Sequence, residues 1–423
     1  MLDLRYIREN PDKIRKACAD KHFQVDVDRL LQLDGQIGGQ RREMEELQAE
    51  RNRLSKTIGK APAEEREALK KQVGALKPRL EELHQQIDQA DSELQDLLLR
   101  VPAPQRDDVP LGKSDADNRE LRQVGTIPEF PFEALDHIEL GKRLGIIDVP
   151  RGVKLAGSRS YVLRGDGARL EQAVLQYTLN FLLDKGYELM SVPVLVDEAA
   201  MVGTGYFPGG RDQAYCVEKD GKALVGTSEV SMASYHGDEI IQFRDGQPMR
   251  FVANTTCFRR EAGTYGKDTH GLYRVHQFQK IEQVILAPAD EALSEKLHDE
   301  LLSNAEAIMQ NLGLPYRVVY VCSGDLGQGQ IRKHDIEAWM PSRKSWGETH
   351  SCSTFHDFQA RRLKIRYKNE QKKNTFVHTL NNTAFASPRG LIPLLEVHQQ
   401  EDGSIAIPEC LQPYMGGRQQ IGP

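Results

Sequence analysis

The residues with the clearest chemistry lie in FRREAGTYGKDTHGLYRVHQFQKIE, residues 258–282, which has the pattern of a β-hairpin with a polar tip. Alternate side chains of a strand share a face, so the pattern separates polar from apolar residues. One face is predicted to carry Arg259, Glu261, Arg274, His276, Phe278, Lys280 and Glu282, and the other Val275, Ile281 and Ile285. Arginine binds phosphate oxygens, a carboxylate accepts from an adenine amino group, and an aromatic ring stacks on a base. These residue types favour a nucleotide site; the alternative is an amphipathic hairpin with a salt-bridged, solvated face.

The chain has 423 residues, which is long enough for two or three domains with a substantial core. It contains no run of about eighteen apolar residues, so we expect no membrane span, and its first residues, MLDLRYIREN, lack the apolar core of a secretion signal. Its six cysteines form no CxxC pair, which favours reduced thiols in a cytoplasmic protein. The close group His350, Cys352 and His356 matches no common zinc spacing, so we predict no zinc site.

Two heptad-like stretches lie near the N-terminus. Apolar residues recur in steps of three and four at Leu30, Leu33, Ile37, Met44, Leu47, Leu54 and Ile58, and again at Leu69, Val73, Leu76, Leu80, Leu83, Ile87, Ala90, Leu94, Leu97 and Val101. This spacing is the seam of a coiled coil, and the short break GKAPAEE predicts an antiparallel helical hairpin over about residues 28–101. At about 1.5 Å per residue each helix would reach roughly 40 to 50 Å. Pro78 is expected to bend the second helix or to mark a frayed region.

Charge is distributed unevenly along this hairpin. The net charge of −6 argues against bulk binding of nucleic acid, but the distribution of charge matters more than its sum. Residues 51–79 hold nine Lys or Arg and only three Glu, so any nucleic-acid contact should concentrate there. The alternative is a dimerisation or spacer coiled coil, which would use the same heptads.

A domain boundary is predicted in VPAPQRDDVPLG, residues 101–112, which is rich in Pro and Asp and divides residues 1–104 from residues 105–423. Beyond it, residues 168–185 are predicted to form a helix that Gly186 closes. The strand in YELMSVPVLVD that follows is interrupted by Pro193. Because proline belongs at a sheet edge or a break, this strand fits either a contact with a dimer partner or an ordinary edge.

Three segments together resemble a known family. FRREAG followed by GLYRVHQFQKIE closely resembles motif 2 of class II aminoacyl-tRNA synthetases, in the form found in bacterial-type seryl-tRNA synthetases. The helix and broken strand resemble motif 1, which forms the dimer interface, and HTLNNTAFASPRGLIPLLEVHQ, residues 378–399, resembles motif 3. The resemblance covers nearly the whole chain. It implies an α+β fold, with an antiparallel β-sheet core flanked by helices in residues 105–423 and a tRNA-binding coiled-coil arm in residues 1–104.

The resemblance implies an activity. The family activates L-serine with ATP to seryl-adenylate and transfers the seryl group to tRNA(Ser), with tRNA(Sec) as a further acceptor that the family allows. It also implies a homodimer, Mg²⁺ bound with ATP, and an arm that holds tRNA largely by backbone contacts. Because A-form RNA hides its base edges in a deep groove, shape and phosphate contacts suit such a rod.

Two further segments supply residues for this activity. LVGTSEVS resembles the family's TxE element and is predicted to be extended, with Thr227 and Glu229 on one face. GETHSCSTFHDFQARR, residues 347–362, resembles the strand that carries a metal-binding glutamate, here Glu348.

The resemblance implies three sets of site residues. ATP would be bound by Arg259, Arg260, Glu261, Val275, Phe278, Glu348, Thr349, His350, Ser351 and Arg389. Serine would be bound by Thr227, Ser228, Glu229, Arg259, Glu282, Asn381 and Thr383. Contact with tRNA would fall to Arg53, Lys56, Lys60, Arg66, Lys70 and Lys71.

The catalytic set implied is Arg259, Glu348 and Arg389. The serine carboxylate is itself the nucleophile, so catalysis requires alignment and neutralisation of charge rather than a protein nucleophile. Arg259 would act at the α-phosphate, Arg389 at the γ-phosphate, and Glu348 would hold Mg²⁺ with ATP. Glu261 and Phe278 would hold adenine, and Val275 would add a main-chain contact.

Motif 3 departs from the commonest pattern of the family. Many relatives have TLNGSGLA and a glycine before the arginine, whereas this chain has Asn382, Thr383, Ala384 and Phe385, and Pro388 precedes Arg389. Thr383 keeps a hydroxyl where serine is usual, but its methyl group changes the pocket. Two alternatives remain: a paralogue that loads another small amino acid onto a carrier, and a catalytically silent tRNA-binding relative. The paralogue should lack the arm, and the silent relative should lack the catalytic residues. This chain has the arm and the catalytic residues.

Overall fold

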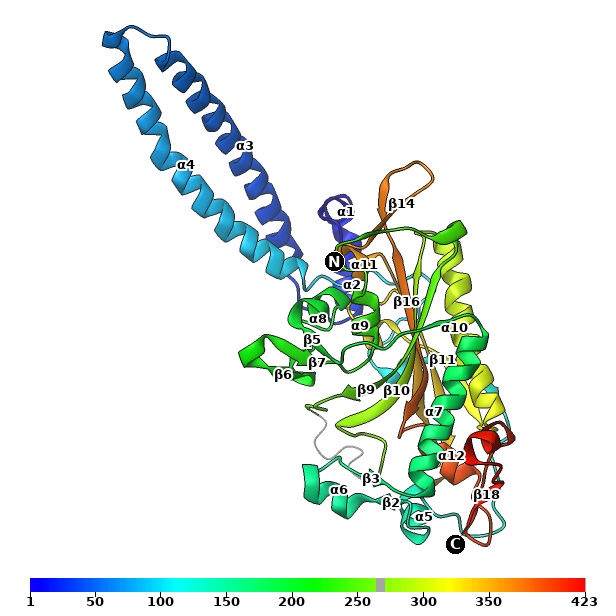
Figure 1. The fold of residues 1–423 in the computed structure, drawn as a ribbon. Coiled ribbons are helices and arrows are strands. Elements are labelled where there is room, and N and C mark those ends of the chain that lie inside the picture. Colours follow the sequence, from blue (N-terminus) through cyan, green and yellow to red (C-terminus); the bar gives the residue numbers. More distant parts are fainter. Residues whose placement is uncertain (264–270, 423) are drawn as a thin grey trace. The chain divides into compact units, whose positions relative to one another are not determined.

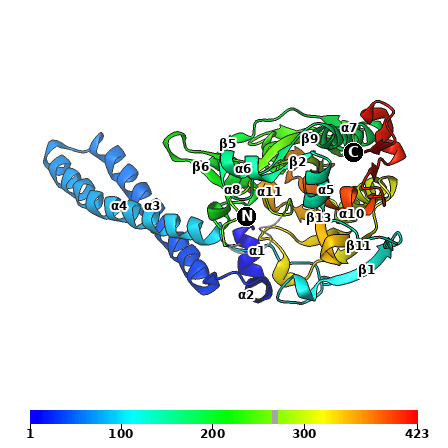
Figure 2. The same ribbon diagram turned by 90° about the horizontal axis from the view of Figure 1, so that it is seen from below.

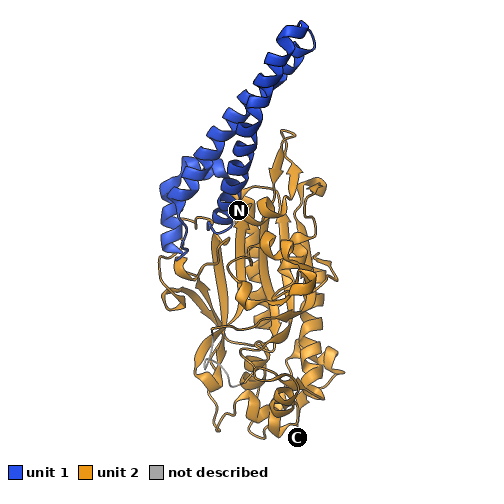
Figure 3. Ribbon diagram, turned by 90° about the vertical axis from the view of Figure 1, so that its left-hand side faces the viewer, with its two compact units in different colours: residues 1–102 blue, residues 103–423 orange. Residues whose placement is uncertain are grey.

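The computed structural model describes residues 1–263 and 271–422, in two compact units, Met1–Pro102 and Ala103–Pro423 (Figure 3). Residues 264–270, the predicted tip of the hairpin, lie outside the described residues. None of the helices in the described ranges is long and apolar enough to cross a bilayer. All six cysteines are free thiols.

The N-terminal unit consists of four helices, α1 (Leu4–Glu9), α2 (Pro11–Asp20), α3 (Val27–Ile58) and α4 (Ala63–Leu98). The Asp26 carboxylate caps α3 by accepting from the Arg29 N–H. α3 and α4 lie side by side as an antiparallel pair, which confirms the predicted hairpin (Figures 1 and 2). Pro78 removes one backbone donor from α4, but the helix continues through it from Ala63 to Leu98.

The seam of this pair changes character along its length. At its base, the apolar cluster is formed by Leu30, Leu33, Ile37, Ile87, Ala90 and Leu94, all buried. Nearer the turn, polar contacts join the helices: the Gln40 amide donates to Gln86 Oε1 at 2.9 Å, and Arg79 pairs with Glu43 at 2.8 Å. Exposed ion pairs of this kind stabilise by about 0–1 kcal/mol each, so apolar burial at the base contributes most of the stability.

The second unit is built on an eight-stranded sheet in the order β1-β11-β12-β13-β16-β10-β9-β4. Its strands are β1 (Arg119–Val124), β4 (Glu188–Leu189), β9 (Met249–Phe258), β10 (Gln277–Ala287), β11 (Tyr316–Tyr320), β12 (Arg332–Met340), β13 (Ser345–His356) and β16 (His378–Ser387). Neighbouring strands are antiparallel except for β4 and β9, which are parallel. This confirms the predicted antiparallel core.

Two long helices run along one face of the sheet, α7 (Asp166–Asp184) and α10 (Glu291–Asn311) (Figure 1). Leu182 of α7 and Leu301 of α10 share an apolar core with Ile281 and Leu380 of the central strands. Each fully buried side chain of this size stabilises the fold by about 1.5–3 kcal/mol. α7 ends as predicted at Gly186, whose φ of +83° lies in the left-handed region that glycine adopts without strain.

Shorter elements complete the unit. The helices are α5 (His137–Arg143), α6 (Val149–Ala156), α8 (Glu198–Thr204), α9 (Glu229–Ser234), α11 (Phe358–Leu363) and α12 (Leu391–Val397). The short strands are β2 (Ile147–Asp148), β3 (Val162–Leu163), β5 (Leu195–Asp197), β6 (Tyr215–Val217), β7 (Lys222–Leu224), β8 (Ile240–Ile241), β14 (Arg366–Lys368), β15 (Asn374–Phe376), β17 (Ile405–Ala406) and β18 (Gln420–Ile421). The predicted broken strand appears as β4 and β5 on either side of Pro193, with β4 at the sheet edge.

Two predictions about strands are wrong in their extent. β9 ends at Phe258 and β10 begins at Gln277, so Arg259, Glu261, Arg274 and Val275 lie beyond the regular ladder. The left-handed backbone of Glu261, with φ of +52°, ends the alternation, and Val275 does not belong to the apolar face. The extended prediction for LVGTSEVS also fails, because β7 ends at Leu224 and Glu229 is the first residue of α9.

Buried histidines predict how stability depends on pH. Burial lowers the pKa of His298, His334, His350, His356, His378 and His398, and those of His334 and His378 fall to about 3. The unfolded chain takes up these protons near pH 6.5, whereas the folded protein does not. The stabilisation is therefore complete above pH 6.5, and the free energy of unfolding should fall by up to about 1.4 kcal/mol per histidine per pH unit below it.

Urea unfolding at pH 8, 6.5 and 5 measures this effect. Burial raises the pKa of Glu171, Glu229 and Asp335, which opposes the effect, but the histidines outnumber them. His378→Asn should reduce the slope, whereas His84→Asn, at an exposed position of α4, should not. Equal stability at pH 6.5 and pH 5 would contradict this account.

Candidate active site

A pocket opens on the face of the sheet that α7 and α10 do not cover. It encloses about 770 Å³, open solvent at its mouth included, and β10, β13 and β16 supply much of its lining. Alternation puts Phe278, Lys280 and Glu282 in the pocket, while Ile281 and Ile285 face the helices.

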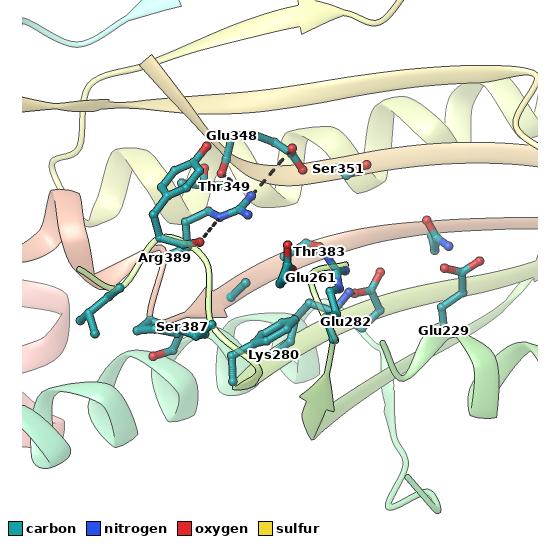
Figure 4. A pocket seen from close by; sticks show the side chains of 18 of the residues that line it. Glu229, Glu261, Lys280, Glu282, Glu348, Thr349, Ser351, Thr383, Ser387 and Arg389 are labelled. Carbon is teal, nitrogen blue, oxygen red and sulfur yellow. Dashed lines mark hydrogen bonds and ion pairs between the residues drawn. The ribbon is translucent and has the colours of Figure 1, made fainter. Parts of the chain in front are cut away.

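The pocket gathers most of the predicted site residues. It is lined by Glu229, Arg259, Glu261, Val275, Phe278, Glu282, Glu348, Thr349, Ser351, Asn381, Thr383 and Arg389. Four predicted residues do not line it: Arg260 is exposed, Ser228 and His350 are buried outside the lining, and Thr227 lies behind Lys280. Figure 4 shows Arg389 and Glu348 at one end and Glu229 at the other, with Lys280, Glu282 and Thr383 between them.

Arg259 and Phe278 form one wall of the pocket. The guanidinium carbon of Arg259 lies 5.3 Å from the centroid of the Phe278 ring, and its Nε donates to the Gly226 carbonyl at 3.4 Å. Glu261 is held nearby by Arg274, whose Nη1 lies 3.2 Å from its carboxylate. An aromatic face, a cation and a carboxylate therefore converge where the sequence predicted an adenine and phosphate site.

Arg389 lies where β16 gives way to α12, as the strand-to-helix junction predicted. Its Nη1 donates to the Glu348 carbonyl at 3.0 Å and lies 3.8 Å from the Glu348 carboxylate (Figure 4). Its Nε donates to the Tyr273 carbonyl at 3.2 Å, and its guanidinium carbon lies 4.3 Å from the centroid of the Tyr273 ring. Burial raises the pKa of Glu348, but Arg389, Lys333 and Arg259 lower it further, so its carboxylate is ionised at neutral pH.

From Arg389 toward Glu229, the pocket contains buried charges. Lys280 is 5% exposed and Glu282 is 2% exposed, and the two form an ion pair on the same face of β10. Lys280 Nζ also donates to Thr227 Oγ1 at 2.7 Å, and Thr227 Oγ1 accepts from the Glu229 N–H at 3.2 Å. Thr227 therefore connects the strand β10 to the start of α9, although its side chain does not line the pocket.

Glu229 is fixed by two further donors. Tyr206 OH donates to its Oε2 at 2.9 Å, and Gln359 Nε2 donates to its Oε1 at 2.7 Å. Gln359 is oriented in turn by Thr379, whose hydroxyl donates to its Oε1 at 2.6 Å. Burial, together with the charge of Glu282, raises the pKa of Glu229 to about 7, so its ionisation changes near neutral pH.

The unusual motif 3 residues are separated by a β-bulge. Thr383 pairs with Glu282 and Phe385 with Ile281, so Ala384 is the extra residue on β16. Thr383 and Asn381 face the pocket, whereas Phe385 packs in the apolar core and Asn382 donates to the Leu301 carbonyl at 2.7 Å. The departures at Asn382, Ala384 and Phe385 therefore lie outside the pocket lining, whereas Thr383 and Pro388 are part of it.

Several lining residues were not in the predicted site, among them Tyr206, Leu272, Tyr273, Lys280, Gln330 and Ser353. Alternation placed Lys280 on the charged face, and this was the one available signal. Tyr206 follows α8 and reaches Glu229 across 23 positions of sequence, so no local pattern indicated it.

The residues at Glu348 fit a magnesium ion that accompanies ATP. The Glu348 side chain is 45% exposed, and Ser351 of the same strand adds a hydroxyl to the pocket wall. Mg²⁺ in nucleotide sites typically takes one or two carboxylates, with phosphates and water as the other ligands. Across residues 1–263 and 271–422, no group of three or more His, Cys, Asp and Glu is placed to hold a metal ion.

Comparisons with known proteins place this geometry in a class. Residues 215–398 match the tRNA synthetase class II core domain (G, H, P, S and T), and residues 1–104 match the seryl-tRNA synthetase N-terminal domain. The antiparallel sheet and its pocket lie in the unit that contains the matched core. The core of this chain is that of a class II aminoacyl-tRNA synthetase.

Individual proteins match over the whole length. Serine–tRNA ligase from Deinococcus radiodurans is 44% identical over 422 residues, covering 100% of this chain and 99% of the relative. Seryl-tRNA synthetase from Pyrococcus horikoshii, solved with ATP, has a TM-score of 0.92 at 34% identity and covers 100% of both chains. Cytoplasmic serine–tRNA ligase from Naegleria fowleri, solved with AMP, has a TM-score of 0.88 at 32% identity, covering 100% of this chain and 99% of that one. The chain belongs to the seryl-tRNA synthetase family.

Proposed function

We propose that this chain activates L-serine with ATP to seryl-adenylate and transfers the seryl group to tRNA(Ser). The observation that carries this proposal is one continuous pocket, lined also by Arg259 and Glu282, with Glu348 and Arg389 at one end and Glu229 at the other (Figure 4). Such an arrangement aligns a nucleotide with a small ammonium-bearing acid. Full-length identity to serine–tRNA ligases supports serine as that acid.

In the first step, a serine carboxylate oxygen attacks the α-phosphorus of ATP. A bond forms between that carboxylate oxygen and the α-phosphorus, giving a mixed anhydride, while the bond from the α-phosphorus to the oxygen that bridges to the β-phosphorus breaks and pyrophosphate leaves with the electron pair. Arg259 stabilises the charge that develops at the α-phosphate, and Arg389 holds the γ-phosphate. Mg²⁺ held through Glu348 and Ser351 would neutralise phosphate charge and favour the departure of pyrophosphate.

In the second step, a terminal hydroxyl of tRNA attacks the carbonyl carbon, and AMP leaves. Phe278 and Glu261 hold the adenine during both steps, with a main-chain contact at Val275. Serine is selected by polar groups that its ammonium and hydroxyl satisfy: Glu229, Glu282 and Thr383. Alanine keeps the ammonium but lacks the hydroxyl, so the group that binds the serine hydroxyl would lose that hydrogen bond, and a site built to bind a hydroxyl rejects an analogue without one.

The N-terminal unit is proposed to bind tRNA. Arg53, Lys56, Lys60, Arg66, Lys70 and Lys71 are all exposed near the turn between α3 and α4. Arg66 donates to the Ala61 carbonyl and Lys70 pairs with Glu67; in the described chain, no ion pair engages the side chains of the other four.

We further propose a homodimer that uses α7 and β4, charging of tRNA(Sec), and action in the cytoplasm, where free thiols such as the six cysteines persist.

Pyrophosphate exchange with each amino acid, without tRNA, tests the activity. Exchange should be strong with serine alone, and Arg259→Ala should lower its rate by about 10²–10³-fold because a preorganised charge at the phosphate is lost. Arg244→Ala, which removes an exposed arginine of the same unit, should change the rate little. Exchange with a different amino acid, or undiminished exchange by the Arg259 variant, would overturn the assignment.

The raised pKa of Glu229 predicts a pH-dependent affinity for serine. Glu229 is protonated below its pKa of about 7, and the ammonium of serine binds the ionised form. The KM for serine in pyrophosphate exchange should therefore fall about fivefold between pH 6 and pH 7 and about tenfold between pH 6 and pH 8, above which it levels off, while the KM for ATP changes little.

Glu229→Gln serves as the control for this titration. It should raise the KM for serine at every pH and remove the pH dependence, because no ionisable group is left at that position. A pH profile that stays the same in this variant would assign the titration to another group.

The arm is tested by reversal of charge. Lys56→Glu combined with Lys60→Glu should raise the KM for tRNA in aminoacylation by about tenfold and flatten its dependence on salt, because phosphate contacts are lost. Pyrophosphate exchange should be unchanged. Lys13→Glu, at an exposed lysine of α2, is the matched control. An unaltered KM for tRNA in the double variant would argue for a spacer role.

A further inference from the structure

His137, the first residue of α5, has a buried side chain that belongs to none of the family motifs. Its Nδ1 lies 2.7 Å from Glu396 Oε1, and its backbone N–H donates to the same oxygen at 3.0 Å. Glu396 lies in α12, seven positions after Arg389. The pair therefore connects α5, which follows β1 in the chain, to the helix that follows Arg389.

Glu396 is fully buried, yet its carboxylate is well supplied with donors. In addition to His137, Ser342 donates through its hydroxyl to Oε1 at 2.8 Å and through its backbone N–H to Oε2 at 2.9 Å. Gln399, three positions after Glu396 in the sequence, donates to the Leu135 carbonyl and accepts from the Leu135 N–H. A buried carboxylate with so many donors fixes the position of each donor, because losing any one leaves charge uncompensated.

The hydrogen bonds assign the tautomer of His137. The Glu396 carboxylate accepts a hydrogen bond from Nδ1. The imidazole proton is therefore on Nδ1, and Nε2 is an acceptor. Nε2 accepts from the Leu272 N–H at 3.1 Å. The neighbouring Gly271 has a φ of +83°, and a Cβ there would lie 2.3 Å from Nε2, so only glycine allows the backbone this close to the ring.

The backbone held by His137 leads directly to Arg389. Leu272 and Tyr273 both line the pocket. The Tyr273 carbonyl accepts from Arg389 Nε, and the Tyr273 ring lies 4.3 Å from the Arg389 guanidinium carbon and 4.2 Å from that of Arg343. Arg343 follows Ser342, which Glu396 also binds. Both supports of Tyr273 therefore trace back to Glu396.

We propose that His137 and Glu396 are positioning residues that hold the 271–273 backbone, and through Tyr273 the guanidinium of Arg389, in place for the γ-phosphate. The proposal rests on the proposed function only for the identity of that phosphate as part of ATP. Neither residue lines the pocket, so each acts through its neighbours. The serine end is supported separately by Lys280, Gln359 and Tyr206, so the pair of His137 and Glu396 should not affect it.

Two substitutions of His137 separate its two bonds. His137→Asn keeps an amide at the position of Nδ1, where it can donate to Glu396, but has no acceptor for the Leu272 N–H. His137→Gln keeps an acceptor at the position of Nε2 and loses the donor to Glu396. His398→Gln is the control, because His398 is a half-buried histidine at the end of α12 that donates to the Leu312 carbonyl and lies outside the pocket.

The measurements are the KM values for ATP and serine in pyrophosphate exchange, ATP affinity by equilibrium dialysis, and the thermal midpoint. His137→Asn should raise the KM and dissociation constant for ATP about tenfold or more and leave the KM for serine unchanged, because misplacement of a phosphate ligand by about 1 Å is costly. His137→Gln should lower the thermal midpoint with an ATP affinity near that of the native protein. The control should change only the thermal midpoint.

Each remaining outcome overturns one specific claim. If both His137 variants lower the thermal midpoint but keep native ATP affinity, the pair is only structural and the inference is wrong. Equal losses for ATP and serine would also overturn it, because the effect would not be confined to the phosphate end. If the native protein shows no exchange with serine, the proposed function fails, and ATP dialysis with the variants still decides the inference.

Discussion

The burial of charge beneath the pocket is the constraint on which the site depends. Lys280, Glu282 and Glu229 are all nearly inaccessible to solvent, and a buried charge costs several kcal/mol unless partners compensate it. Their partners come from distant parts of the chain: Thr227 before α9, Tyr206 after α8 and Gln359 in α11. The need to compensate these charges therefore fixes several short elements around one end of the sheet.

The alternation of side chains along the central strands lets one sheet serve two purposes. In β10 the odd-numbered residues Ile281 and Ile285 pack under α7 and α10, while the even-numbered residues Phe278, Lys280 and Glu282 face the pocket. The bulge at Ala384 changes the phase of β16, so Thr383 lies beside Glu282 in the pocket while Phe385 joins the apolar core. The bulge therefore permits an unusual motif 3 sequence, because its bulky residue packs away from the substrate site.

Local patterns in the sequence predicted the elements, and contacts between distant segments decided the details of the site. Heptad spacing identified α3 and α4, Gly186 identified the end of α7, and Pro193 identified the break between β4 and β5. Alternation did not predict that β9 ends at Phe258 or that Glu261 has a left-handed backbone, because a conformation at one residue leaves no periodic signal. Tyr206, Gln359 and His137 were not predicted because their partners are 23, 130 and 259 positions away in the sequence.

The end of the pocket proposed to bind the amino acid and the end proposed to bind phosphate are held by different kinds of interaction. The amino-acid end rests on side chains of the sheet and of α9 and α11, where a regular ladder limits movement. The phosphate end rests on backbone outside the ladder, at residues 259–263 and 271–276, where the Gln213 side chain bonds to both backbone groups of Ala262 and His137 bonds to Leu272. Backbone without strand neighbours needs side-chain partners to satisfy its polar groups, and these partners also fix its path. Substitutions of the residues that support one end should therefore change the binding of one substrate and leave that of the other unchanged. A pocket built wholly on one rigid sheet would not allow this separation.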